Sequence, residues 1–251
     1  MDENKISELL TTSEFGRNLL LIDETDSTNA EALRLIKKGP VKNGTTIIAE
    51  KQTAGKGRFG RAWLSDGGLC MTVIIKYAGN PPPLATLSAG VAVAEGLSTA
   101  VGREFFVKYP NDVYTAKTGG RKIGGILAQS AKGHLIIGIG VNVSQESFPA
   151  ELLEKAESLK TLGMTISKEA VAGHILNSLE RNMELADAGN IGLIRGKWLK
   201  LNCTIGERVS IRDVSPPVEG TAAGLDEDGA LVVETANGPV RVRAGEITIE
   251  G

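Results

Sequence analysis

Between residues 104 and 143 the sequence alternates strand-like runs with very short gaps, and no other feature limits the possible folds as strongly. The runs are rich in β-branched and apolar residues, and the gaps hold turn sequences such as Lys132-Gly133. Neighbouring parallel strands need a crossover of about a dozen residues or more, so gaps this short require hairpins. We therefore expect this region to form the antiparallel part of a sheet.

Helix and strand patterns extend this prediction over residues 1 to 200. Residues 19–23 predict a buried strand, and a helix should follow with Thr28 as its N-cap and Glu31 as its capping-box partner. The pattern is that of an α+β fold with a mixed, largely antiparallel sheet and helices. Further expected elements are paired strands at 45–52 and 69–77, a helix at about 84–101 after the break at Pro81-Pro82-Pro83, and amphipathic helices at about 149–162, 167–187 and 191–199.

The character of the sequence changes after Asn202. Four or five short strand-like runs, separated by turn pairs such as Asp228-Gly229 and Asn237-Gly238, occupy about 50 residues. This density of strands and turns is typical of a small SH3-like β-barrel. We predict two domains, at residues 1–200 and 201–251.

Charge and composition limit the partners. The chain has 28 basic and 30 acidic residues and 4% aromatic residues, so we expect no DNA partner. No apolar run reaches the roughly 18 residues that cross a bilayer, and we expect a soluble, cytoplasmic protein without a membrane partner. Two separated cysteines and two histidines predict neither a disulfide framework nor a zinc site.

The segment from Gly55 to Arg61 (GKGRFGR) formally contains G-x-G-x-x-G. A dinucleotide-binding loop needs a helix directly after it, and here a strand-like run follows. A P-loop is also excluded, because Lys56 precedes Gly57 where a hydroxyl residue should stand. The segment is either a solvated surface turn or a flexible loop whose cations, with that of Arg58, bind phosphate or carboxylate oxygens.

Three later segments hold polar residues at the ends of strands: KYPND at 108–112, KIGGIL at 122–127 and GIGVNV at 138–143. Proline ends the first run, so Asn111 and Asp112 should stand at a strand end, where ligand contacts are often placed. Taken singly, they are equally explained by a turn, by a solvated Lys122 and by a core hydrogen-bond network around Asn142.

In this order and spacing, the segments resemble those of the biotin protein ligases along essentially the whole chain. That family has a Ser-Thr-Asn turn, a GRGRxGR-type loop and the segments KWPND, KxxGIL and GIGxNV; the turn here is residues 27–29. This sequence departs from the pattern at Lys56, at Phe59, where arginine is common, and at Tyr109, which replaces tryptophan. The resemblance implies a class II synthetase-like catalytic domain for biotin and ATP, followed by the SH3-like domain. Because only about 18 residues precede the first strand, it implies the ligase without the DNA-binding module of many bacterial members.

The resemblance also implies a reaction. ATP, as its Mg²⁺ complex, and biotin would be substrates, with no tightly bound cofactor, and biotinyl-5′-AMP would form and pass biotin to a lysine of a biotin carboxyl carrier protein. A homodimer stays open. The alternatives are a lipoate or octanoyl ligase or transferase of the same fold, against which the polar residues 27–29 and Gln52 argue, and a DNA-binding regulator.

The family's functional residues fall on fourteen positions of this chain. By the resemblance, Lys122 and Arg58 would be catalytic, and Asp112 would contact magnesium through ATP. Biotin would contact Ser27, Thr28, Asn29, Gln52, Lys56, Gly57, Arg58, Lys122 and Gly125, and the nucleotide would contact Arg58, Arg61, Lys108, Asn111, Asp112 and Asn142.

Overall fold

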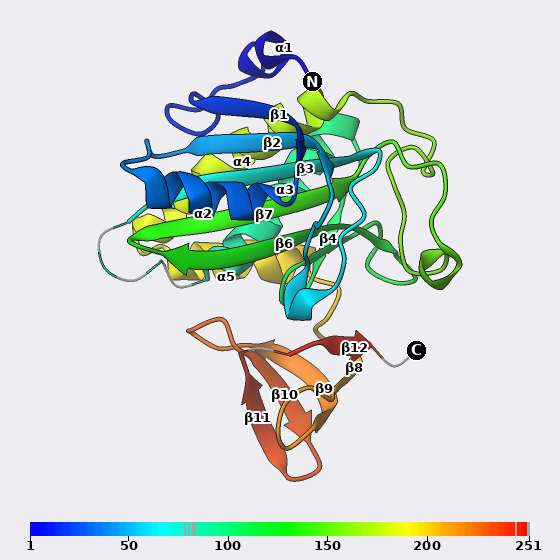
Figure 1. Ribbon diagram of the computed structural model, residues 1–251. Helices are drawn as coiled ribbons and strands as arrows, with labels where there is room; N and C mark the ends of the chain where they lie inside the picture. Colours follow the sequence, from blue (N-terminus) through cyan, green and yellow to red (C-terminus); the bar gives the residue numbers. More distant parts are fainter. Residues whose placement is uncertain (78, 80, 82–83, 244, 250–251) are drawn as a thin grey trace.

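The computed structural model describes residues 1–251 except 78, 80, 82–83, 244 and 250–251. Figure 1 shows a large sheet with helices on both faces and a separate, smaller sheet that carries the C-terminal part of the chain. This arrangement confirms the predicted α+β fold class. Within the described residues, no helix is both long and apolar enough to span a bilayer.

The large sheet has seven strands in the order β1-β2-β3-β7-β6-β5-β4. β1 runs parallel to β2, and every other neighbouring pair is antiparallel, as the short gaps predict. The strands are β1 (Leu19–Thr25), β2 (Thr45–Gln52), β3 (Gly68–Lys76), β4 (Phe106–Lys108), β5 (Asp112–Tyr114), β6 (Lys122–Ala131) and β7 (His134–Asn142).

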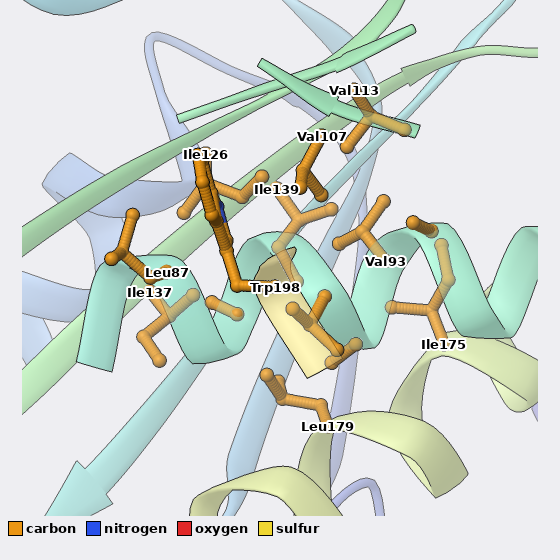
Figure 2. Close-up of a cluster of buried hydrophobic side chains, with 14 of the residues drawn as sticks. Leu87, Val93, Val107, Val113, Ile126, Ile137, Ile139, Ile175, Leu179 and Trp198 are labelled. Carbon is orange, nitrogen blue, oxygen red and sulfur yellow. The ribbon is translucent and has the colours of Figure 1, made fainter. Parts of the chain in front are cut away.

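The central strands are buried on both faces. Along β7, Ile136 packs with α2 (Thr28–Lys38) on one face, while its neighbour Ile137 joins the larger core on the other. That larger core includes α3 (Ala85–Val101), α4 (Lys168–Asp187) and α5 (Ile191–Leu201). Figure 2 shows the packing, with Leu87 and Val93 of α3, Ile137 and Ile139 of β7, Ile175 and Leu179 of α4, and Trp198 of α5.

The C-terminal sheet has five antiparallel strands in the order β11-β10-β9-β8-β12. It is tied to the large sheet through Tyr109, whose N–H donates to Oγ1 of Thr204 at 2.9 Å and whose hydroxyl donates to the carbonyl of Val242 at 2.9 Å. The Tyr109 ring also meets Trp198 edge-on at 6.1 Å. The strands are β8 (Arg208–Ile211), β9 (Val218–Leu225), β10 (Leu231–Thr235), β11 (Gly238–Val242) and β12 (Ile247–Ile249).

The predicted helix at 149–162 is wrong. Only the short 3-10 helix η2 (Ala150–Leu152) forms there. The rest of the segment uses its backbone groups against the sheet, since the N–H of Lys122 donates to the carbonyl of Lys155 at 2.8 Å and the N–H of Leu159 donates to that of Asn142 at 3.1 Å. Its apolar residues face the core from an extended chain rather than from one side of a helix.

The predicted capping box is also wrong. The N-cap of α2 is Ser27, and Thr28 is its first residue. The hydroxyl of Thr28 bonds to other side chains, and Glu31 binds Arg34 at 2.7 Å. The sequence prediction missed the helix α1 (Glu3–Ser7) and the parallel pairing of β1. Of the predicted proline break, residues 82–83 lie outside the described residues.

Candidate active site

A cavity of about 880 Å³ lies between the glycine-rich loop, the ends of β5 to β7 and the last strand of the C-terminal sheet. Its size is within the usual range for small-molecule sites. All fourteen predicted positions line it: Ser27, Thr28, Asn29, Gln52, Lys56, Gly57, Arg58, Arg61, Lys108, Asn111, Asp112, Lys122, Gly125 and Asn142. The structure therefore brings together segments that are up to 115 residues apart in the sequence.

One end of the cavity is polar and neutral. Its residues sit where β1 passes into α2 and on the adjoining strands. The N–H of Thr28 donates to Oε1 of Gln52 at 2.8 Å, and Thr72 of β3 joins the group with its hydroxyl 2.8 Å from that of Thr28 and 2.7 Å from Oδ1 of Asn29. The amide of Asn29 donates to the carbonyl of Leu127 at 3.2 Å. We call Ser27, Thr28, Asn29, Gln52 and Thr72 the neutral end.

Two glycines of β7 make room for this end of the cavity. A Cβ at Gly138 would lie 2.2 Å from Oδ1 of Asn29, and a Cβ at Gly140 would lie 2.4 Å from the ring of Trp63. Both distances are shorter than any contact that a side chain tolerates. The two glycines of GIGVNV therefore allow side chains from other segments to lie against the strand.

The turn at residues 25–29 is fixed from outside the cavity. The carboxylate of Asp26 accepts the N–H of Ser27 at 2.7 Å and binds both terminal nitrogens of Arg34, at 2.7 and 3.0 Å. These hydrogen bonds, that of Arg34 above all, hold the pKa of Asp26 well below its usual range. The backbone carbonyl of Asp26 also accepts the N–H of Ala54, so the same turn holds the base of the glycine-rich loop.

The other end of the cavity is charged. Lys108 of β4 stands opposite Asp112 of β5, and Tyr114 of β5 stands opposite Lys122 of β6. The Nζ of Lys122 lies 2.7 Å from Oδ1 of Asp112. A Cβ at Gly125 would lie 3.3 Å from Cε of Lys122, so the glycine leaves space for that side chain. We call Arg58, Lys108, Asn111, Asp112 and Lys122 the charged end.

Lys108 is held differently from Lys122. Its Nζ lies 3.4 Å from the hydroxyl of Tyr114 and 5.2 Å from the centre of that ring. Burial lowers the pKa of Lys108 and raises that of Tyr114, because removal from water disfavours the charged form of each group.

The glycine-rich loop folds back on itself. The N–H of Gly57 donates to the carbonyl of Arg61 at 2.7 Å, and the N–H of Trp63 donates to that of Gly55 at 2.9 Å. Gly60 has a φ of +74°, which favours glycine. Phe59 is 63% exposed, and the guanidinium of Arg58 lies 4.9 Å from the centre of its ring.

The loop also reaches across the cavity. Nη1 of Arg58 donates to Oδ1 of Asn111 at 3.1 Å and to the carbonyl of Gly245 at 3.3 Å. Arg61 forms an ion pair with Glu246. The arginines of the loop thus contact both the KYPND segment and the connection between β11 and β12.

Asn142 takes part in a hydrogen-bond network within the protein. Its amide donates to the carbonyl of Glu157 at 2.9 Å, and its Oδ1 accepts from Gln145 at 3.3 Å. This is the core network that the sequence left open as an alternative. The predicted contact of Asn142 with the nucleotide stays a prediction.

The charge of the cavity is opposite to that of the chain. The whole chain has a formal net charge of −2, yet basic side chains outnumber acidic ones around the cavity. Such a surface attracts anions into a partly enclosed space. The basic residues are Lys56, Arg58, Arg61, Lys108, Lys117, Lys122 and Lys155, and the acidic ones are Asp112, Glu207 and Glu246.

Comparisons with known proteins identify the family. The profile described as "Biotin/lipoate A/B protein ligase family" matches residues 21–144, and that described as "Biotin protein ligase C terminal domain" matches residues 204–249. The biotin–[acetyl-CoA-carboxylase] ligase of Mycobacterium tuberculosis is 31% identical over 98% of this chain and 95% of its own length. The chain belongs to the biotin protein ligase family.

Another relative is the bifunctional ligase/repressor BirA of Bacillus spizizenii, which is 32% identical over 99% of this chain and 79% of its own length. The structure of the biotin protein ligase from Aquifex aeolicus in complex with biotin and ATP superposes with a TM-score of 0.81. It is 29% identical and covers 93% of this chain and 99% of that one. Family membership and fold class, both expected from the five motifs, are confirmed.

The sequence prediction missed several residues of the cavity of this biotin protein ligase. Trp63 lies 5.8 Å from Nζ of Lys122, and its buried Nε1 has no hydrogen-bond partner within the described part of the chain. It directly follows the loop motif, and an aromatic residue there was the available signal. Thr72 and Glu246 carried none, because each lies within an ordinary strand-like run. Burial raises the pKa of the nearby Cys70 thiol to about 11, which makes it unreactive.

The described residues include no group of three or more histidine, cysteine, aspartate or glutamate side chains close enough to hold a metal. Magnesium in nucleotide sites is commonly held by one or two carboxylates together with substrate phosphates. The carboxylate of Asp112 lies in the cavity beside Lys122, so its chemistry fits such a role with ATP. Its contact with magnesium stays a prediction.

Proposed function

We propose that this protein activates biotin with ATP to form biotinyl-5′-AMP and then transfers the biotinyl group to a lysine of a carboxyl carrier protein. The observation that carries the proposal is a single cavity that joins a neutral, hydrogen-bonding end to a cationic end. A neutral polar ring with an acidic tail is the type of substrate that these two ends suit.

The neutral end suits the ureido ring of biotin, which has both hydrogen-bond donors and acceptors. The hydroxyl of Ser27 and Nε2 of Gln52 have no recorded protein partner among the described residues, and both line the cavity. Asn29 and Thr28 are held by Thr72 and Gln52, which fixes their orientation before a ligand binds. An acyl chain without the ring would leave these polar groups unpaired, which disfavours a lipoate or octanoyl substrate.

The charged end suits the first step. A carboxylate oxygen of biotin would attack the α-phosphorus of ATP, and the bond to the β-phosphate oxygen would break to release pyrophosphate. The two anions repel each other, and cations fixed near both lower the barrier. Lys122 and Arg58 stand in the required place, with Asn111 and Asp112 beside them.

In the second step, the carrier lysine would attack the carbonyl carbon of the mixed anhydride, and AMP would leave. Neither step requires a covalent bond to the enzyme. Positioning and electrostatics would supply the rate in a closed site. The name of the Mycobacterium tuberculosis relative, a biotin–[acetyl-CoA-carboxylase] ligase, supports a carboxylase carrier as the acceptor.

Exchange of labelled pyrophosphate into ATP tests the first step, and the gain of one biotin by a carrier domain, measured by mass spectrometry, tests the second. We expect both to depend on biotin. The matched control is the same carrier with arginine in place of its target lysine, which should gain no mass. Exchange with lipoate or octanoate and not with biotin would favour the alternative substrate, and folded protein without exchange or transfer would refute the proposal.

A further inference from the structure

Four side chains form a compact group on one face of β4, β5 and β6. Lys108 lies opposite Asp112, and Tyr114 lies opposite Lys122, so the group has two cross-strand pairs. All four line the cavity. Asp112 and Lys122 form an ion pair with each other, which leaves Lys108 as the second amine of the group.

Lys108 has no ion-pair partner. The structure records no carboxylate within 4.0 Å of its Nζ among the described residues, and its polar contact is the Tyr114 hydroxyl at 3.4 Å. The Nζ lies over the aromatic ring and is partly buried. A lysine removed from water without a paired carboxylate gains neutral character and is suited to accept a proton.

The surrounding groups act in both directions. Burial is the largest influence and lowers the pKa of Lys108, and the positive charge of Lys122 lowers it further. Asp112 on β5, Cys203 before β8 and Glu246 before β12 raise it. The net direction is downward, in part because the carboxylate of Asp112 is engaged with Lys122. Near neutral pH, the neutral amine is therefore a larger fraction of Lys108 than of an ordinary lysine.

We infer that Lys108 accepts the proton that the carrier lysine must lose before it attacks the biotinyl adenylate. This inference rests on the proposed function. An ordinary lysine has a pKa of about 10.4, so only a small fraction of the carrier lysine is nucleophilic at neutral pH. The sequence resemblance assigned Lys108 to nucleotide binding, and the inferred role belongs to the other half-reaction.

The step balances as follows. The carrier ε-ammonium gives one proton to Nζ of Lys108, and its free electron pair forms a bond to the biotinyl carbonyl carbon. The bond from that carbon to the phosphate oxygen breaks, and AMP leaves with the electron pair. The second proton lost from the new amide nitrogen goes to water, and Lys108 returns its proton to solvent after the products leave.

The other titratable groups nearby fit this role less well. Asp112 is occupied by Lys122 at 2.7 Å. Burial raises the pKa of Tyr114, and it raises the pKa of Cys203 to about 11, so both keep their protons near neutral pH. Only Lys108 in this group combines a cavity position with a shift that frees its acceptor atom.

The test separates the two half-reactions. Isolated biotinyl-5′-AMP bound to the enzyme is mixed with a carrier domain, and the single-turnover transfer rate is measured across pH, while pyrophosphate exchange reports adenylate formation. We compare the unaltered protein with Lys108→Met, which lacks the amine, and Lys108→Arg, which keeps a charge that does not dissociate. Lys76→Met, at the exposed end of β3, is the matched control.

In the unaltered protein, the transfer rate should rise with pH through an inflection below that of an ordinary lysine. Both Lys108 variants should transfer about a hundredfold more slowly near neutral pH, with the loss shrinking toward about pH 10, where the carrier lysine loses its proton unaided. Pyrophosphate exchange should fall by less than about tenfold. Lys76→Met should match the unaltered protein in both assays.

Several results would overturn the inference alone. If Lys108→Met slows both half-reactions equally and Lys108→Arg restores both, then Lys108 is a phosphate-binding cation. Unchanged transfer in the two variants has the same consequence. If the variants do not fold, a transfer profile of the unaltered protein without the low inflection overturns it. If the unaltered protein neither exchanges nor transfers, the proposed function and this inference fall together.

Discussion

The two ends of the cavity are built by different means. At the neutral end, Thr28, Asn29, Gln52 and Thr72 bond to one another across β2, β3 and the start of α2. At the charged end, the contacts join a loop, a hairpin and the C-terminal sheet, as when Arg58 reaches Asn111 and Gly245. The first end is fixed within one sheet, and the second is assembled from parts that meet only in the folded protein.

This difference teaches which end determines affinity and which determines rate. A group whose orientation is set beforehand binds its ligand at little entropic cost, so changes at the neutral end should weaken biotin binding. Fixed cations that face developing charge stabilise the transition state, so changes at the charged end should slow the chemical step. Four variants test this division.

The largest effect should follow from Lys122→Ala. Loss of the cation should slow adenylate formation at least about a hundredfold, which is roughly 2.7 kcal/mol, while the fold is kept. Pre-steady-state adenylate formation and a thermal unfolding curve measure the two. Lys76→Ala is the control at an exposed strand end. A near-normal rate would mean that the Lys122 charge has no part in the chemistry.

The next largest effect should follow from Gly138→Ala. Its Cβ would lie 2.2 Å from Oδ1 of Asn29, so the amide must move. We expect a stability loss of about 1–3 kcal/mol and biotin binding at least about tenfold weaker. Gly192→Ala in α5, where nothing lies within 4 Å, should be neutral or stabilising by up to about 1 kcal/mol. Denaturant titration and calorimetry measure both, and normal biotin binding by Gly138→Ala would show that Asn29 is not a biotin ligand.

Thr72→Val should have a smaller effect, confined to affinity. The change keeps the shape and removes the hydroxyl at Asn29, which costs about 1–2 kcal/mol. Biotin should bind roughly tenfold more weakly with little change in the maximal rate. Thr221→Val, exposed on β9, serves as the control. A loss of maximal rate as large as that of Lys122→Ala would remove the division between the two ends.

The smallest effect should follow from Glu246→Gln. The Arg61–Glu246 pair is exposed, with side chains 64% and 43% accessible, and such pairs contribute less than about 1 kcal/mol. We expect trypsin to cleave after Arg61 a few-fold faster in the variant and much more slowly in both proteins with biotin and ATP present. Glu234→Gln on β10 is the matched control. Cleavage that ligands do not slow would show that the loop does not close over them.

The sequence predicted the strands and the set of segments around the cavity because both have local signals. Alternating apolar residues and short gaps determine hairpins, and the five motifs occur in a fixed order. The helix expected at 149–162 failed because its apolar residues allow two conformations, and the backbone bonds of Lys155 and Leu159 to the sheet decide between them.

The contacts inside the cavity had no local signal. Thr72 follows from the register that places β3 beside β7, and Glu246 from the approach of the C-terminal sheet to the loop. The need for glycine at 138 and 140 is visible only once Asn29 and Trp63 are in place. These are long-range properties, which a pattern in one stretch of chain does not encode.

The close approach of Gly138 to Asn29, and of Gly140 to Trp63, also has an evolutionary consequence. In each pair, the side chain fills the space that the glycine leaves, so the effect of a substitution at one position depends on the residue at the other. A side chain gained at 138 becomes tolerable only in a background that has already lost Asn29. Variation at these positions should therefore be strongly epistatic, with the order of two changes deciding whether a lineage keeps a working intermediate.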